Sequence, residues 1–140
     1  MSMSVESIVI ATDLNKTFKA EQKGLDDVQA LQGINMQIKT GQLTALVGPD
    51  GAGKTTFLRL IAGLYKPTAG SLEVLGMDVA KDPQSVQDRI SYMPQKFGLY
   101  EDLSIQENLD LYADLHGVPM NVRKERFARL LKITDLARFT

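Results

Sequence analysis

The sequence has no cysteine, no tryptophan and a single histidine among its 140 residues, and only 6% of them are aromatic. The absence of cysteine excludes disulfides, thiolate zinc sites and cysteine nucleophiles. A lone histidine excludes a metal site built from several histidines. No apolar run approaches the roughly 18 residues that a membrane-spanning helix needs. We therefore expect no direct insertion into a membrane.

The sequence also lacks an excess of charge of either sign, because it has 16 Lys and Arg residues and 17 Asp and Glu residues, a net charge of −1. This balance argues against a chain that binds nucleic acid over its whole surface. The first six residues contain no basic cluster, and the sixth is the acidic Glu6, so they do not resemble a secretory signal. The length suits one domain that buries enough surface without a metal or disulfide.

The first half of the chain has mainly strand patterns. Alternating or continuous apolar residues predict strands over 5–11, 34–38, 43–47 and 71–75, and a helix over 54–64. The run Leu43–Val47 is bounded by glycines, which is typical of a strand buried on both faces of a sheet. Residues 19–27 are polar and charged, and we expect an exposed loop there.

The second half has mainly helical patterns. Ser104 and Glu107 have the spacing of a capping box and predict the start of a helix. Ile105, Leu109 and Tyr112 then share an apolar face with His116, which we expect to pack or to cap the helix rather than to act in catalysis.

A last helix is predicted after Asn121, which is expected to be its N-cap. Residues 121–140 carry six basic and two acidic residues. The interpretation is a solvated helix face rather than a nucleic-acid surface. The adjacent Glu101 and Asp102 are expected to be solvated charges rather than a catalytic pair.

The segment Gly48-Pro49-Asp50-Gly51-Ala52-Gly53-Lys54-Thr55-Thr56 fills every fixed position of the G-x-x-x-x-G-K-[ST] phosphate-binding motif. Gly51 and Gly53 allow the turn that points successive N–H groups inward. Lys54 supplies a mobile positive charge for the β- and γ-phosphates, and the helix that begins near it adds unpaired amides and the positive end of its dipole.

Two threonines complete this loop. The Thr55 hydroxyl suits Mg²⁺, a hard ion that prefers oxygen ligands, and Thr56 is placed to donate to the α-phosphate. Asp50 brings a carboxylate near the triphosphate, which opposes anion binding unless it turns outward or is paired. On its own, the loop predicts a nucleoside triphosphate and leaves the kind of protein open.

Further segments occur in a fixed order around the loop: Asp13–Phe18, Ala30–Ile34, Lys39–Gln42, Tyr92–Gln95 and Leu99–Leu109. Together with the loop they resemble the ATP-binding subunit of an ABC transporter, and the resemblance is greatest to bacterial multidrug-export systems of the ABC-2 type. The loop itself resembles the Walker A motif of that family, which more often has Asn at the position of Asp50.

The resemblance implies an α/β fold, a P-loop NTPase of the ABC ATPase type. It would comprise N-terminal antiparallel strands, the Walker A strand, loop and helix, and the start of a helical subdomain, truncated before the signature motif and Walker B. Residues 1–140 would form the N-terminal part of one ATP-binding domain. In it, about 1–100 would be the core with the Q-loop and about 101–140 the helical subdomain.

The resemblance also implies the cofactors ATP and Mg²⁺ and a set of site residues. Phe18 would stack on adenine, and Gln95 of the Q-loop would reach Mg²⁺ or the attacking water. Catalysis would involve Lys54 and Gln95, and the metal would be bound by Thr55 and Gln95. The nucleotide would contact Phe18, Gly48, Pro49, Asp50, Gly51, Ala52, Gly53, Lys54, Thr55 and Thr56.

The implied partners are a transmembrane permease and a second ATP-binding subunit in a dimer that sandwiches nucleotide. The implied place is the cytoplasmic face of the cell membrane, reached through the permease, and no nucleic acid is expected. The substrate is not determined by this sequence, and export rather than import rests on the family likeness.

The family's signature motif, Walker B strand and switch histidine have no counterpart before Thr140. We therefore expect these 140 residues by themselves to bind ATP, to lack hydrolysis, and to expose an unpaired apolar edge at 43–47 that favours self-association. Two alternatives stay open: a P-loop kinase of small metabolites and an inert nucleotide-binding fragment.

Overall fold

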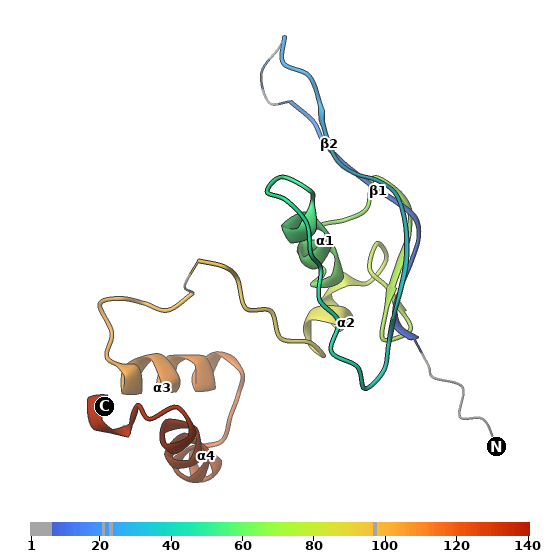
Figure 1. Cartoon of the computed structure of the whole chain (residues 1–140). Coiled ribbons are helices and arrows are strands. Elements are labelled where there is room, and N and C mark those ends of the chain that lie inside the picture. The colour runs from blue at the N-terminus through green and yellow to red at the C-terminus, as the bar shows by residue number, and fades with distance from the viewer. Residues whose placement is uncertain (1–6, 21, 23, 97) are drawn as a thin grey trace, which may run out of the picture. The chain divides into compact units, whose positions relative to one another are not determined.

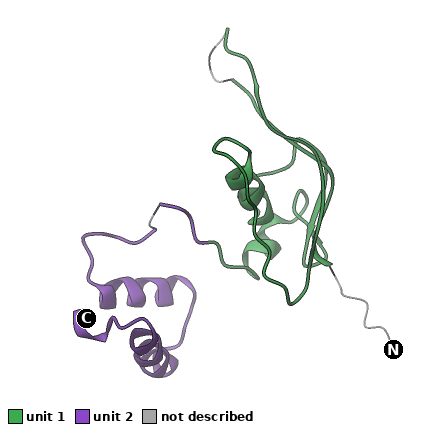
Figure 2. Cartoon of the chain, in the orientation of Figure 1, with its two compact units in different colours: residues 1–92 green, residues 93–140 purple. Residues whose placement is uncertain are grey.

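The computed structural model describes residues 7–20, 22, 24–96 and 98–140. These divide into two compact units, residues 1–92 and residues 93–140 (Figure 2). Val5, which belongs to the first predicted strand, and Phe97, which follows the Q-loop, lie outside the described residues. Each unit is described by itself.

The first unit is built on an antiparallel sheet of four strands in the order β2-β1-β3-β4 (Figure 1). The strands are β1 (Ser7–Phe18), β2 (Val28–Lys39), β3 (Ala69–Val74) and β4 (Met77–Asp78). The predicted strands at 5–11, 34–38 and 71–75 are thus confirmed, but the first two are longer than predicted. Their additional residues are mostly polar, and the β1–β2 pairing keeps them extended.

Two helices pack against one face of this sheet: α1 (Lys54–Ile61) and α2 (Pro83–Gln87). Figure 1 shows both on the same side of the strands. The core between them is apolar and contains Val9, Ala11, Leu14, Leu31, Phe57, Leu60, Leu72, Val74, Val79 and Val86. Because each fully buried Leu, Val or Phe side chain contributes about 1.5–3 kcal/mol, this core holds α1 in place.

The prediction of a strand over Leu43–Val47 is wrong for this structure, since the segment forms no strand. Leu43 is 103% exposed and Val47 is 94% exposed. A strand persists only where a neighbour accepts its backbone hydrogen bonds. Within the part of the chain that the structure describes, the four-stranded sheet offers no neighbour to this segment.

The second unit contains α3 (Ile105–Leu115), α4 (Met120–Ile133) and the short 3-10 helix η1 (Ala137–Phe139). The predicted capping box is confirmed: Ser104 Oγ accepts from the backbone N–H of Glu107 at 3.2 Å, and Glu107 Oε2 accepts from the backbone N–H of Ser104 at 2.8 Å. His116 is exposed and caps the C-terminal end of α3.

Two expectations for α4 are corrected. Its N-cap is Pro119, whose φ of −63° and ψ of 143° are extended, and Asn121 already lies inside the helix. Arg123 is not part of a solvated face but is buried, at 9% exposure. Its guanidinium donates to Asp114 Oδ1 at 2.6 Å and to the carbonyl of Val118 at 2.8 Å, which joins α4 to α3.

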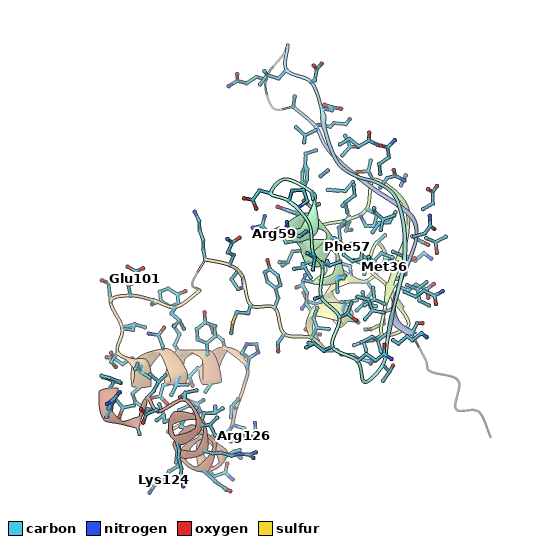
Figure 3. The ribbon with its side chains drawn as sticks, in the orientation of Figure 1. Met36, Phe57, Arg59, Glu101, Lys124 and Arg126 are labelled. Atoms are coloured by element: carbon cyan, nitrogen blue, oxygen red, sulfur yellow. The ribbon has the colours of Figure 1, made fainter. Side chains whose placement is uncertain are left out.

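The other basic side chains of α4 agree with the solvated interpretation. Lys124, Arg126 and Arg129 are exposed, and the first two point away from the ribbon in Figure 3. Glu101 and Asp102 are exposed as well, as expected for solvated charges. Among the described residues, no helix has the length and apolar character needed to cross a membrane.

Candidate phosphate-binding site

Residues 48–53 form a loop that leads directly into α1, and residues 54–56 are the first of that helix. Gly51 and Gly53 have φ of 79° and 84°, in the left-handed region that favours glycine. Helix α1 begins at Lys54, and the first hydrogen bond across its start runs from the N–H of Phe57 to the carbonyl of Gly53 at 2.9 Å. The amides of Lys54, Thr55 and Thr56 therefore have no helical carbonyl to bind and face the end of the loop.

Gly53 is also fixed by contact with the sheet. A Cβ atom at this position would lie 2.5 Å from the carbonyl oxygen of Ala30 and 2.7 Å from Leu31 Cδ2, both in β2. At Gly51, by contrast, a Cβ would meet nothing within 4 Å. Glycine at 53 thus serves two purposes: it allows the left-handed turn, and it lets the start of α1 approach β2.

The Lys54 side chain curls back over the loop. Its Nζ donates to the carbonyl of Gly48 at 2.7 Å and to that of Pro49 at 2.6 Å. These bonds hold the ammonium on two carbonyls of the loop that precedes the first helical turn. A positive charge and inward amides in one place suit a phosphate group.

The remaining loop positions also suit an anion. The first turn of α1 contains no acidic residue, so no carboxylate there repels phosphate. Gly48, Pro49, Asp50, Gly51, Ala52 and Thr55 are exposed, while Gly53, Lys54 and Thr56 are partly buried. Exposure of Asp50 leaves its carboxylate in water, where its repulsion is weakened. The Thr55 hydroxyl is an oxygen of the type that Mg²⁺ prefers, and its role as a metal ligand stays a prediction.

A cavity of about 140 Å³ lies beside the loop, between the start of α1 and the β2 side of the sheet. Its lining is apolar except for Lys54 and includes Met36 and Phe57, which Figure 3 labels. An apolar space does not suit a charged phosphate. The loop surface is therefore the candidate phosphate site, rather than this cavity.

Phe18 lies at the end of β1 and takes part in a cluster of aromatic and cationic side chains. Its ring centroid is 5.3 Å from that of Tyr65, and the two rings cross at 76°. Lys16 Nζ lies 5.0 Å from the Phe18 centroid and 5.5 Å from the Tyr65 centroid. Arg59 of α1 donates from Nη1 to Tyr65 Oη at 3.0 Å. We call Lys16, Phe18, Arg59 and Tyr65 the aromatic cluster.

Three residues of this cluster were missed by sequence reasoning, which singled out Phe18 alone. No local pattern marks Lys16, Arg59 or Tyr65, because they lie on β1, on α1 and after α1. Their one sequence signal is weak: Arg59 stands five positions after Lys54 on the helix that the motif starts. Only the folded sheet and helix bring Arg59 and Tyr65 to Phe18, whereas Lys16 lies two positions from it on β1.

Gln95 is exposed and belongs to the second unit, residues 93–140. Phe18 and the phosphate loop belong to the first unit. The structure therefore brings the loop residues together, while the role of Gln95 toward the phosphates stays a prediction.

A family model described as "ABC transporter" matches residues 31–140 of this chain. The chain is 47% identical over 135 residues to the "Probable multidrug ABC transporter ATP-binding protein YbhF" of Escherichia coli (strain K12), covering 96% of this chain and 22% of that protein. It is 36% identical to the "Daunorubicin resistance ATP-binding protein DrrA3" of Streptomyces coeruleorubidus, covering 86% of this chain and 38% of that one. The chain thus spans well under half the length of these relatives.

A solved structure has a similar fold. It is described as "Dimeric structure of a post-hydrolysis state of the ATP-binding cassette MJ0796 bound to ADP and Pi", and it superposes with a TM-score of 0.78 at 27% sequence identity. The match covers 94% of this chain and 59% of that one.

Proposed function

The chain belongs to the ABC transporter family, and we propose that it is the ATP-binding part of a subunit that hydrolyses ATP to drive export through a membrane partner. The observation that carries this proposal is the phosphate loop. Two glycines with positive φ, an unpaired first helical turn and the Lys54 ammonium meet there. These groups fit a triphosphate by chemistry and by placement.

Each loop residue has a distinct task in this proposal. The backbone N–H groups of Gly51–Gly53 and of the start of α1 bind phosphate oxygens. Lys54 moves from its carbonyl partners in the loop to the β- and γ-phosphates, because a phosphate oxygen offers its ammonium a charge-assisted hydrogen bond. Thr56 donates to the α-phosphate.

The proposed metal ligands are the Thr55 hydroxyl and the Gln95 side-chain oxygen. When bound, Mg²⁺ neutralises the charge that develops on the transferred phosphoryl group. Gln95 would also orient the attacking water. Both residues are exposed, so neither must break a buried contact to reach these ligands.

The base end of the site is assigned to Phe18. Its ring is partly buried at the end of β1, which leaves ring surface for stacking. Base stacking on an aromatic side chain typically contributes about 1–3 kcal/mol. We further propose that residues of about 1–100 form the ATP-binding core and those of about 101–140 the start of a helical subdomain.

The proposed partners are a transmembrane permease and a second ATP-binding subunit. The dimer described for the cassette with a similar fold supports the second of these. An apolar pocket of about 570 Å³ in the second unit, lined by Leu99, Leu103, Leu109 and Tyr112 among others, offers a surface for a protein partner. With a permease as partner, the subunit would lie at the cytoplasmic face of the membrane. The names of the relatives favour drugs as cargo.

Calorimetric titration with Mg²⁺ and ATP tests the nucleotide site. Lys54→Ala should weaken ATP affinity about tenfold to a hundredfold, since a hydrogen bond to a charged group contributes about 1.5–3 kcal/mol. Lys124→Ala, which removes an equal charge from the exposed face of α4, is the matched control and should bind like the unaltered chain. Equal affinity of the two variants would contradict the assignment of Lys54.

Export is tested in cells. Replacing the gene by one that carries Lys54→Ala should slow efflux of daunorubicin, whose own fluorescence reports its retention. Replacement by the Lys124→Ala gene should leave efflux unchanged. Normal efflux with Lys54→Ala would refute drug export by this subunit while leaving ATP binding to the calorimetric test.

A further inference from the structure

The four residues of the aromatic cluster form a chain of contacts that starts at the helix of the phosphate loop. Arg59 stands five positions after Lys54 on α1, which corresponds to about 7.5 Å along the helix axis. Arg59 Nη1 then donates to Tyr65 Oη at 3.0 Å, and its guanidinium carbon lies 5.7 Å from the Tyr65 ring centroid. The Tyr65 ring contacts Phe18. Phe18 is thus linked to the same rigid helix that positions the phosphate-binding amides.

The backbone that carries Tyr65 is tied to the end of β1. Thr68 Oγ1 accepts from the N–H of Thr17 at 3.0 Å, and the N–H of Thr68 donates to the carbonyl of Asn15 at 2.9 Å. Lys16 Nζ donates to the carbonyl of Lys66 at 2.9 Å. These bonds join residues that lie about fifty positions apart in the sequence. The two rings therefore meet because the fold holds the end of β1 against the segment after α1.

Arg59 has a second phenolic partner. The hydroxyls of Tyr92 and Tyr65 raise the pKa of the Arg59 guanidinium above its ordinary value. Arginine remains charged at any pH of interest, and its planar donors suit two acceptors at once. The Tyr65 ring is thus held at two points: at its backbone, and at its hydroxyl by the hydrogen bond from Arg59.

We propose that Tyr65 is a positioning residue for nucleotide binding, which holds the Phe18 ring in the orientation that stacks on the adenine of ATP. The proposal rests on the proposed function. Tyr65 acts through Phe18: it limits the rotamers of a partly buried ring at the end of β1.

The physical basis is preorganisation. A side chain that is ordered only on binding loses rotamer freedom at that moment, and this loss weakens binding. A Phe18 ring already held by Tyr65 and Lys16 avoids this loss. Removing the Tyr65 ring should therefore weaken nucleotide binding about threefold to tenfold. Inorganic tripolyphosphate, which has no base, should be unaffected.

The experiment measures the affinities of ATP, ADP and tripolyphosphate by calorimetry for the unaltered chain, Tyr65→Phe and Tyr65→Ala. We expect ATP and ADP to weaken by the stated factor in Tyr65→Ala, with unchanged tripolyphosphate affinity. Tyr65→Phe keeps the ring and loses the Arg59 bond, so we expect a smaller loss of about twofold. Leu64→Ala, which truncates the exposed neighbouring residue, should match the unaltered chain.

A double-mutant cycle separates positioning from packing. In a Phe18→Ala background, Tyr65→Ala should cause no further loss of ATP affinity, because the residue through which it acts is absent. The proposal is overturned by unchanged ATP affinity in Tyr65→Ala, by an equal loss for tripolyphosphate, or by a loss that persists without Phe18. If Tyr65→Ala does not fold, as judged by circular dichroism, Tyr65→Phe decides: equal affinities of this variant and the unaltered chain for ATP overturn the proposal.

The two proposals fail in different ways. If the unaltered chain binds no ATP, or if Lys54→Ala binds it equally well, the proposed function is wrong. If Lys54→Ala behaves as expected and the Tyr65 variants do not, only the positioning role of Tyr65 is wrong.

Discussion

Gly53 offers a sharp test of how the loop is built, because Gly51 provides a matched control two positions away. Both glycines have positive φ, 84° and 79°, so alanine is strained at either position by about 1–2 kcal/mol. Alanine also reduces the entropy of the unfolded chain, which offsets about 0.4–1 kcal/mol of this strain. The net destabilisation from backbone conformation alone is thus about 0.5–1 kcal/mol at both sites.

The two sites differ in the space around the added methyl group. At Gly51 it would meet nothing within 4 Å, whereas at Gly53 it would lie 2.5 Å from the carbonyl oxygen of Ala30. That oxygen belongs to the backbone of β2 and cannot move without disturbing the sheet. Overpacking of this kind typically costs a further 1–3 kcal/mol, so Gly53→Ala should destabilise the first unit by about 1.5–4 kcal/mol in total.

Hydrogen exchange of the α1 amides measures this difference, since it reports on the first unit by itself. The α1 amides of Gly53→Ala should exchange about fivefold to a hundredfold faster than those of Gly51→Ala. Equal exchange in the two variants would refute the argument that close packing of the loop against β2, in addition to the positive φ, requires glycine at position 53.

Further predictions concern single side chains. Asn108 is buried and bonds the N–H and carbonyl of Tyr100 and the carbonyls of Leu103 and Ser104; Asn108→Ala should lower the free energy of unfolding by about 1–3 kcal/mol in urea denaturation, and an unchanged midpoint would contradict this. Hydrogen bonds from Ser104 hold the pKa of Glu107 below its ordinary value of 4.5. The ionised Glu107 carboxylate therefore stabilises α3 above about pH 4.5, and this stabilisation is lost as the pH falls through the lower pKa of the folded state. Glu107→Gln cannot ionise, so this part of the pH dependence of helicity, measured by circular dichroism, should be absent from it. Leu72→Ala should cost about 2–5 kcal/mol, while Leu43→Ala should cost almost nothing because that side chain is fully exposed; similar losses in thermal denaturation would refute the contrast.

The sequence by itself determined the features that depend on neighbouring residues. The phosphate loop, the helix after it and the Ser104–Glu107 capping box each use contacts within a few positions, so a short motif is sufficient to predict them. The resemblance of ordered segments also indicated the family correctly, because motif order survives where individual residues change.

Only the tertiary structure decided the features that join distant segments. Leu43–Val47 has the composition of a buried strand, but composition does not supply the neighbour that a strand needs. Arg123 has the sequence of a solvated helix face, yet its contact with Asp114 buries it. The aromatic cluster is the clearest case: Phe18 and Tyr65 are 47 positions apart, and their rings meet because hydrogen bonds across the fold bring β1 and the segment after α1 together.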